Sequence, residues 1–249
     1  MLHEVLLALS GHPSPLFDLG SKASDWFPLI TPAETDLLVS IGRLAKLHAA
    51  LKSHLPRISS IHPSKICRAV STAILSSHLP QFQKRILEVE AQILTEDSST
   101  VGAYNIVPLA WVIRCFDEWT RKIEWYWATA CFILPEDARP SSDHDSKALS
   151  GACNGAAILN RLRQDSQTGY PDIEIIATDL AGISERAWLR QLSTWFLQGR
   201  SPHGREWDLF MQVEQNKARL SPEFTINQNL LPDFVTPKLH LLLYLRVRR

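Results

Sequence analysis

Apolar residues recur at three- and four-residue steps along most of this chain, and this spacing limits the fold more than any other feature of the sequence. The period matches one face of an α-helix, whereas strand-like alternation is nearly absent. Only residues 171–176 offer a serious alternative strand. Clusters of Pro, Gly and Ser divide the pattern into segments. The sequence therefore predicts an all-α fold without a sheet, an elongated bundle of packed antiparallel helices.

Residues 31–34, Thr-Pro-Ala-Glu, have the form of a capping box with Pro at the first helical position, so a helix should start there. His48 lies on the apolar face of this helix, where we expect a hydrogen-bonded core residue rather than a metal ligand. Pro80 should kink or restart the helix that covers residues 63–95, because Pro lacks a backbone donor and clashes with the preceding turn. Further helices are predicted at residues 2–10, 108–134, 147–163, 172–198 and 206–213, with linkers at 98–105, 136–146 and 164–169.

Charge and cysteine content argue against several function classes. The 249 residues include 26 acidic and 26 basic side chains, which leaves no field to attract nucleic acid or an anionic membrane. No apolar stretch is long enough to cross a bilayer, and the basic start of a secretion signal is missing. The cysteines are far apart in the sequence and form no CxxC pair, so we expect free thiols; they are Cys67, Cys115, Cys131 and Cys153.

No residue pattern points to catalysis, a metal or a cofactor. The nine histidines include no HExxH and no helical HxxxH pair, and His12, His62 and His203 adjoin Pro or Gly as loop residues do. Cys153 stands among the small residues of 151–155, which favour close helix packing; a nucleophilic thiol would need a base beside it. We therefore expect a protein that is not an enzyme.

Two tryptophans in the segment 108–134 fall on the wrong side of its predicted helix. On a helical wheel the apolar residues gather on one face, while Trp111 and Trp125 fall among the charged residues opposite. Two alternatives follow. Both rings pack against a second part of the same chain, or they form a patch that binds a partner, since Trp contributes strongly to interfaces.

A motif near residue 195 resembles the first grip motif of the γ-tubulin complex components. An apolar helix that carries Trp195 stops at a Gly-x-x-Pro break, which begins at Gly199. An acidic-then-aromatic segment follows with Asp208 and Phe210; the family usually has two Phe here, and Leu209 replaces one of them. The resemblance makes these four positions the motif residues, with core packing as the expected role of Trp195.

Other segments resemble the same family in the same order. Residues 1–16 look like the N-terminus of its fourth branch in filamentous fungi, and residues 82–90 and 151–155 are similar to later helices. Residues 230–235 look like a Leu-Pro-x-aromatic-aliphatic segment of the family, whereas residues 238–249 depart from its pattern. The resemblance treats the whole chain as one helical region, similar to the N-terminal half of these proteins and lacking their C-terminal half.

This resemblance implies a non-catalytic scaffold. In the family the N-terminal half contacts neighbouring components laterally, and the C-terminal half grips γ-tubulin as a template for microtubule nucleation. The expected partners are other γ-tubulin complex components, with γ-tubulin reached only indirectly, and the expected location is the cytoplasm at a microtubule organising centre or spindle pole. Periodicity alone fits a helical tether or adaptor of another assembly equally well, and an enzyme acting through Cys153 is the third hypothesis.

Overall fold

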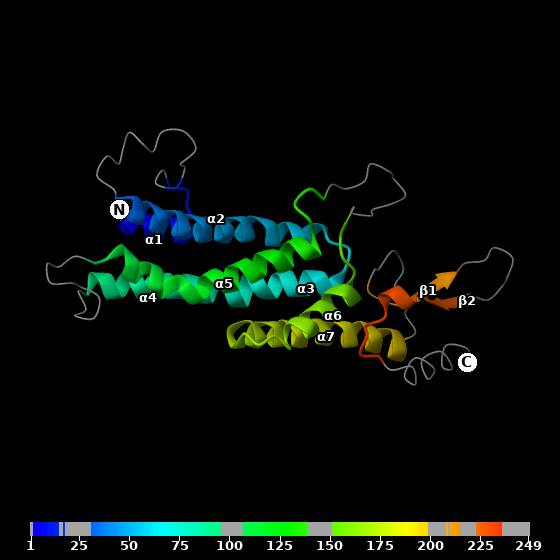
Figure 1. Ribbon diagram of the computed structural model, residues 1–249. Helices are drawn as coiled ribbons and strands as arrows, with labels where there is room; N and C mark the ends of the chain where they lie inside the picture. The colour runs from blue at the N-terminus through cyan, green and yellow to red at the C-terminus, as the bar shows by residue number, and fades with distance from the viewer. Residues whose placement is uncertain are drawn as a thin grey trace. The chain divides into compact units, whose positions relative to one another are not determined.

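The computed structural model describes residues 2–14, 17, 31–95, 107–138, 151–198, 208, 210–214 and 223–235. Figure 1 labels the helices and strands. The chain divides into two compact units. Unit 1 comprises residues 1–56 and 74–130, and unit 2 comprises residues 57–73 and 131–249. Within the described residues each unit is built mainly of helices, which confirms the all-α fold class.

Unit 1 contains α1 (Leu2–Leu9), most of α2 (Pro32–Ile61), the π-helical turn η2 (Ile74–His78), α4 (Leu79–Leu94) and most of α5 (Leu109–Ile133). The predicted capping box starts α2, where the Thr31 amide donates to Glu34 Oε2 at 2.9 Å and the Glu34 amide to Thr31 Oγ1 at 3.4 Å. The hydrogen bond from the Thr31 amide holds the pKa of Glu34 below its usual range. Pro80 lies in the first turn of α4, directly after the π-turn, so the predicted interruption is confirmed.

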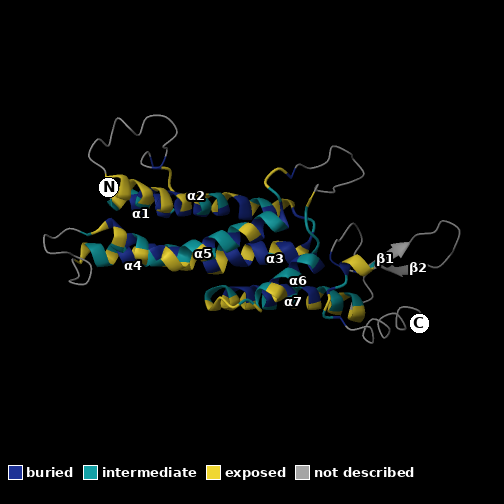
Figure 2. Ribbon diagram, in the orientation of Figure 1, coloured by how far each residue is buried: buried dark blue, intermediate teal, exposed yellow. Residues whose placement is uncertain are grey.

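The core of unit 1 is centred on Phe82 of α4. Its ring lies 4.9 Å from that of His48 on α2, and 5.9 and 5.2 Å from those of Phe116 and Trp119 on α5. These ring contacts bring α2, α4 and α5 into one core. Buried residues recur along these helices, as the dark blue segments of Figure 2 show. His48 is a buried core residue, as predicted. Its ring nitrogens have no well-formed hydrogen bond among the described residues, so the prediction that this histidine is hydrogen-bonded is wrong.

Unit 2 contains α3 (Lys65–Ala73), α6 (Gly155–Asp165), α7 (Pro171–Gln198), β1 (Met211–Glu214), β2 (Glu223–Ile226) and the 3₁₀ turn η3 (Gln228–Leu230). α6 and α7 pack together across a five-residue connection, and α3 contacts both. Residues 171–176 form the first turns of α7, so the alternative strand is excluded. The guanidinium of Arg57 donates to the carbonyls of Glu136 and Ala138 at 3.1 and 2.6 Å, which ties the chain before α3 to the segment after α5.

Two predictions of local structure are wrong in unit 2. The helix expected from residue 147 begins at Gly155, because Gly151 adopts a positive φ of 82° and Asn154 is extended and caps the first turn through Ala157 N. The helix expected at residues 206–213 is replaced by a turn at Asp208 and the strand β1, which pairs antiparallel with β2. The prediction of no sheet is therefore also wrong. The two strands pair over four residues each, from Met211 with Ile226 to Glu214 with Glu223.

Candidate functional site

Asp208 connects two helices of unit 2. Its Oδ2 accepts hydrogen bonds from the backbone amides of Lys65 and Ile66 at 2.6 and 3.1 Å, and from Nε2 of Gln191 on α7 at 3.0 Å. The side chain is only 2% exposed. A carboxylate at this position satisfies amides that have no partner within α3, and it complements the positive end of the helix dipole. Asp208 is thus a structural tie between α3 and α7.

The start of α6 also reaches this carboxylate, and only a glycine permits the approach. A Cβ added to Gly155 would lie 2.4 Å from Asp208 Oδ1 and 2.7 Å from Cδ1 of Ile66. Both separations are far below van der Waals contact. The prediction that the small residues of 151–155 serve close packing is confirmed at Gly155. We call Asp208, Gly155, Gln191 and the first turn of α3 the motif junction.

The N-terminus of α3 has a second cap within the junction. Ser64 accepts the Cys67 amide on its Oγ at 3.1 Å and donates its own amide to Nδ1 of His62 at 3.1 Å. His62 lies in the short link between α2 and α3, which confirms the prediction of a loop residue, and it is buried there. Four orphan amides at a helix start need partners, and at α3 Asp208 accepts two of them, Ser64 Oγ accepts the third and His62 accepts the fourth.

Phe210, the motif residue two positions after Asp208, is completely buried. Its carbonyl accepts the Asn227 amide at 2.7 Å, which continues the pairing of β1 and β2 by one residue. The neighbouring carboxylate of Asp208 therefore ties the chain just before the hairpin to α3 and α7. Gly199 lies outside the described residues, as does His203.

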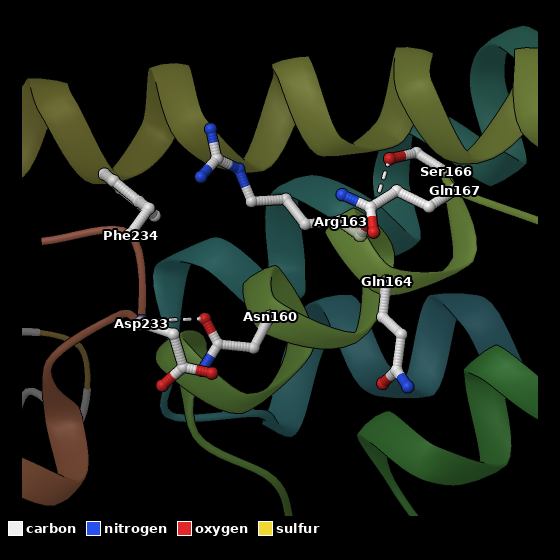
Figure 3. Close-up of a pocket in the computed structure, with 7 residues that line it drawn as sticks. All are labelled: Asn160, Arg163, Gln164, Ser166, Gln167, Asp233 and Phe234. Atoms are coloured by element: carbon white, nitrogen blue, oxygen red, sulfur yellow. Dashed lines mark hydrogen bonds between the residues drawn. The ribbon is translucent and has the colours of Figure 1, made fainter.

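The turn at residues 231–235 packs on α6 and α7, in the segment that resembles the family's Leu-Pro-x-aromatic-aliphatic pattern. The Asp233 amide donates to Oδ1 of Asn160 at 3.1 Å (Figure 3). The Phe234 ring lies 4.3 Å from the Arg163 guanidinium and 5.4 Å from the ring of Trp188. Arg163 is in turn bound to Glu185 on α7 at 2.6 Å. This clamp at Phe234 was signalled only by the family pattern and not by any chemical motif.

The hollow drawn in Figure 3 is polar and open. It is lined by residues of α6, of the connection to α7 and of the 231–235 turn, namely Asn160, Arg163, Gln164, Ser166, Gln167, Asp233 and Phe234. Arg163 already pairs with Glu185 and stacks on Phe234. The polar groups of this hollow thus hold the 231–235 turn against α6, and none of them is arranged as a nucleophile with a base.

The last turns of α7 expose apolar side chains. Leu189, Phe196 and Leu197 are 54, 42 and 79% exposed, and with Leu192 they follow helical spacing along one face. A shallow hollow runs along this face between Leu189 and Leu197. Trp195 lies beside this face, with its ring 6.5 Å from that of Phe196, and it is half-buried. We call Leu189, Leu192, Phe196 and Leu197 the α7 stripe.

Trp111 and Trp125 are both half-buried on α5 of unit 1. The Trp125 ring packs edge-on against Tyr126 at 5.6 Å. Glu118 and Lys122 form an ion pair on the charged face between them, as their spacing predicts. The burial of each side chain lies between that of a core residue and that of a fully exposed one. Packing within the chain and binding to a partner therefore both stay predictions for these two residues.

Within the described residues, no group of three or more His, Cys, Asp and Glu side chains is arranged to hold a metal ion. In the same part of the chain, no helix has the length and apolar character needed to cross a bilayer. The arrangement at the motif junction is one of buried hydrogen bonds and close packing. Such a site can position helices and the surfaces they carry, which is a structural rather than a chemical task.

Comparison with known proteins agrees with the resemblance seen in the sequence. The family profile described as "Gamma tubulin complex component N-terminal" matches residues 2–242. The chain is 22% identical over 218 residues to "Gamma-tubulin complex component 4" of Homo sapiens, and 22% identical over 218 residues to the protein of that name from Mus musculus. Each alignment covers 80% of this chain and 29% of the relative, so the chain spans less than a third of their length.

Proposed function

Because the chain belongs to the γ-tubulin complex component family and matches its N-terminal region, we propose that it is a non-catalytic scaffold of a γ-tubulin complex. In this role it contributes lateral contacts between components of an assembly that nucleates microtubules. Its place of action is then the cytoskeleton, at a microtubule organising centre or spindle pole. The names of the two relatives support the assembly.

The observation that carries this proposal is the α7 stripe. Four apolar side chains at helical spacing are left partly or largely open by the described residues of unit 2, and Leu197 is the most exposed of them. A contiguous apolar patch on a helix is typical of a protein contact. A neighbouring component of the complex is the occupant that family membership favours.

The motif junction supports the same proposal, because it holds the face of α7 that does not carry the α7 stripe. Gln191 on α7 is bound by Asp208, and Trp188 one turn earlier is buried against Phe234. These contacts hold the inner face of α7 while its outer face stays open. A binding surface on a rigid helix loses less entropy on association than one on a loose segment.

The test is a binding experiment with purified neighbouring components. The double variant Leu189→Ser, Leu197→Ser removes apolar surface from the stripe, and we expect binding to weaken by roughly tenfold or more, as for hot-spot residues. The matched control is Leu87→Ser, Leu94→Ser on α4, where the side chains are similarly exposed at 63 and 76%. The control should bind normally, and equal binding by both double variants would refute the assignment of the stripe.

A second arm of the experiment concerns γ-tubulin. Since these 249 residues match the family's N-terminal region, we expect them to reach γ-tubulin only through their neighbours. Purified γ-tubulin should therefore show no direct, saturable binding to the chain. Such binding, if measured, would overturn the division of roles while leaving family membership intact.

A further inference from the structure

Two cysteines that are 86 positions apart in the sequence meet inside unit 2. The Sγ atoms of Cys67 and Cys153 are 3.7 Å apart, and the Cys67 Sγ is also 3.9 Å from the Cys153 carbonyl oxygen. Cys67 belongs to the first turn of α3 and is completely buried. Cys153 lies just before α6 and is partly exposed. Both are free thiols.

The backbone on each side of this pair is fixed. The Cys67 amide donates to Ser64 Oγ at 3.1 Å, and the amides of the two preceding residues, Lys65 and Ile66, donate to Asp208. The Cys153 amide donates to the Ile133 carbonyl at 3.2 Å, and Asn154 caps α6. The contact between the sulfurs is thus part of the packed junction. To reach the disulfide bond length of about 2.05 Å they must approach by roughly 1.7 Å, within the reach of side-chain rotation and small backbone shifts.

We propose that Cys67 and Cys153 are a modification site that forms a reversible disulfide when the chain meets a hydroperoxide. The step begins at Cys153, because it is the exposed member. Its thiolate attacks one peroxide oxygen, the O–O bond breaks, and the other oxygen leaves as alcohol or water after it takes a proton, which gives a sulfenic acid. The Cys67 sulfur then attacks the Cys153 sulfur, the S–S bond forms, and the S–O bond breaks with release of water.

The atoms and electrons balance. Two thiols and one hydroperoxide yield one disulfide, one alcohol or water from the peroxide, and one further water. The two sulfurs supply the two electrons that reduce the peroxide. Burial raises the pKa of the Cys67 thiol well above its usual range, so little thiolate is available there. The proton of the Cys67 thiol therefore leaves as the S–S bond forms, and the departing hydroxide takes it up as water.

The bond would join the first turn of α3 to the entry of α6. Asp208 and Gly155 already bring the same two elements together. Oxidation should therefore add a covalent link across the motif junction without changing the α7 stripe, and a thiol reductant should restore the starting state. The inference rests on the geometry of the two sulfurs and is independent of the proposed function.

The test uses the full chain, treated with hydrogen peroxide, alkylated with N-ethylmaleimide and digested without reductant. Of the four cysteines, we expect two to become inaccessible to alkylation after denaturation. Mass spectrometry should show a peptide pair joined through Cys67 and Cys153, two hydrogens lighter than the thiols, that dithiothreitol separates. Cys115→Ser and Cys131→Ser are matched controls that should form the same link.

Cys153→Ser should abolish the link and leave Cys67 unreactive toward alkylation in the folded chain. Because this variant changes a partly exposed residue, it stays informative if Cys67→Ser fails to fold. A wild-type chain in which Cys153 proceeds to sulfinic acid while Cys67 remains a thiol would overturn the proposal. A disulfide that involves Cys115 or Cys131 instead would do the same.

Discussion

Asp208 accepts the backbone amide of Lys65 at 2.6 Å across 143 positions of sequence. The contact joins a motif residue to the start of a helix that sequence comparison alone would treat as unrelated to it. It also explains why an acidic side chain suits this position, since the amides at a helix start have no partners inside the helix and carry partial positive charge.

Asp208→Ala should destabilise unit 2. The change removes the acceptor of three hydrogen bonds, two of them to backbone amides at the start of α3, and leaves buried donors without partners. We expect a loss of roughly 3 kcal/mol, seen as a fall in Tm of roughly 10 °C. Asp208→Asn keeps one carbonyl acceptor and should lose less. Asp137→Asn at an exposed position is the control, and a Tm for Asp208→Ala equal to that of the control would rule out the tie.

Two glycines provide an internal comparison. Gly155→Ala should lower the free energy of unfolding by roughly 1–3 kcal/mol, because its Cβ would meet Asp208 and Ile66 at 2.4 and 2.7 Å. Gly182→Ala, in the middle of α7, meets nothing within 4 Å and should raise it by up to about 1 kcal/mol through helix propensity. Chemical denaturation of both variants measures the two signs. A stabilising Gly155→Ala would contradict the close approach at the junction.

His48 should make unit 1 sensitive to acid. Burial lowers its pKa to about 4, with a smaller contribution from Lys52, and the Leu9 backbone offsets this only in part. The unfolded chain takes up a proton near pH 6.5, so between pH 6.5 and 4 it holds more protons than the folded chain. Stability therefore falls as the pH drops from 7 to 4, by about 3 kcal/mol from this group.

The measurement is the free energy of unfolding from denaturant titrations at several pH values. His48→Gln should flatten the profile between pH 4 and 6.5, whereas His12→Gln at an exposed position should leave it unchanged. If the profiles of wild type and His48→Gln run parallel, another group is responsible for the acid sensitivity.

The variant Trp111→Ser, Trp125→Ser should remain folded with a moderate loss. Both side chains are half-buried, so we expect roughly 1–2 kcal/mol for each, below the ~3–5 kcal/mol typical of a fully buried aromatic residue. Trp119→Ser is the comparison within α5 and should cost more, because that ring packs on Phe82. Equilibrium denaturation followed by circular dichroism gives the summed loss for the double variant and the loss for Trp119→Ser. Complete unfolding of the double variant would place both rings in the core.

The elements that the sequence predicted best are those whose signals are local. The capping box of residues 31–34 and the apolar stripe of α5 each depend on residues within a few positions of one another, and both are present as expected. The interruption at Pro80 follows from the missing donor of one residue. Such features need no knowledge of distant parts of the chain.

The features that the sequence did not predict depend on distant partners. β1 has only four residues, too few to show a period of two, and its pairing with β2 is what makes it a strand. The resemblance marked Asp208 as a motif residue but did not show that it binds the start of α3. The proximity of Cys67 to Cys153 has no sequence signal either, since neither belongs to a short-range cysteine pattern.

The dependence of α3 on Asp208 also bears on how the chain is made. Contacts between positions far apart in sequence can form only after both have been synthesised, and they close late because of the loop between them. When residues 64–73 leave the ribosome, Ser64 can cap them at once, but the acceptor for Lys65 and Ile66 is still well over a hundred residues from being translated. In a nascent chain stopped before residue 208, the amides of Lys65 and Ile66 therefore lack their acceptor. Unit 2 can acquire its full set of contacts only after residue 208 has been translated.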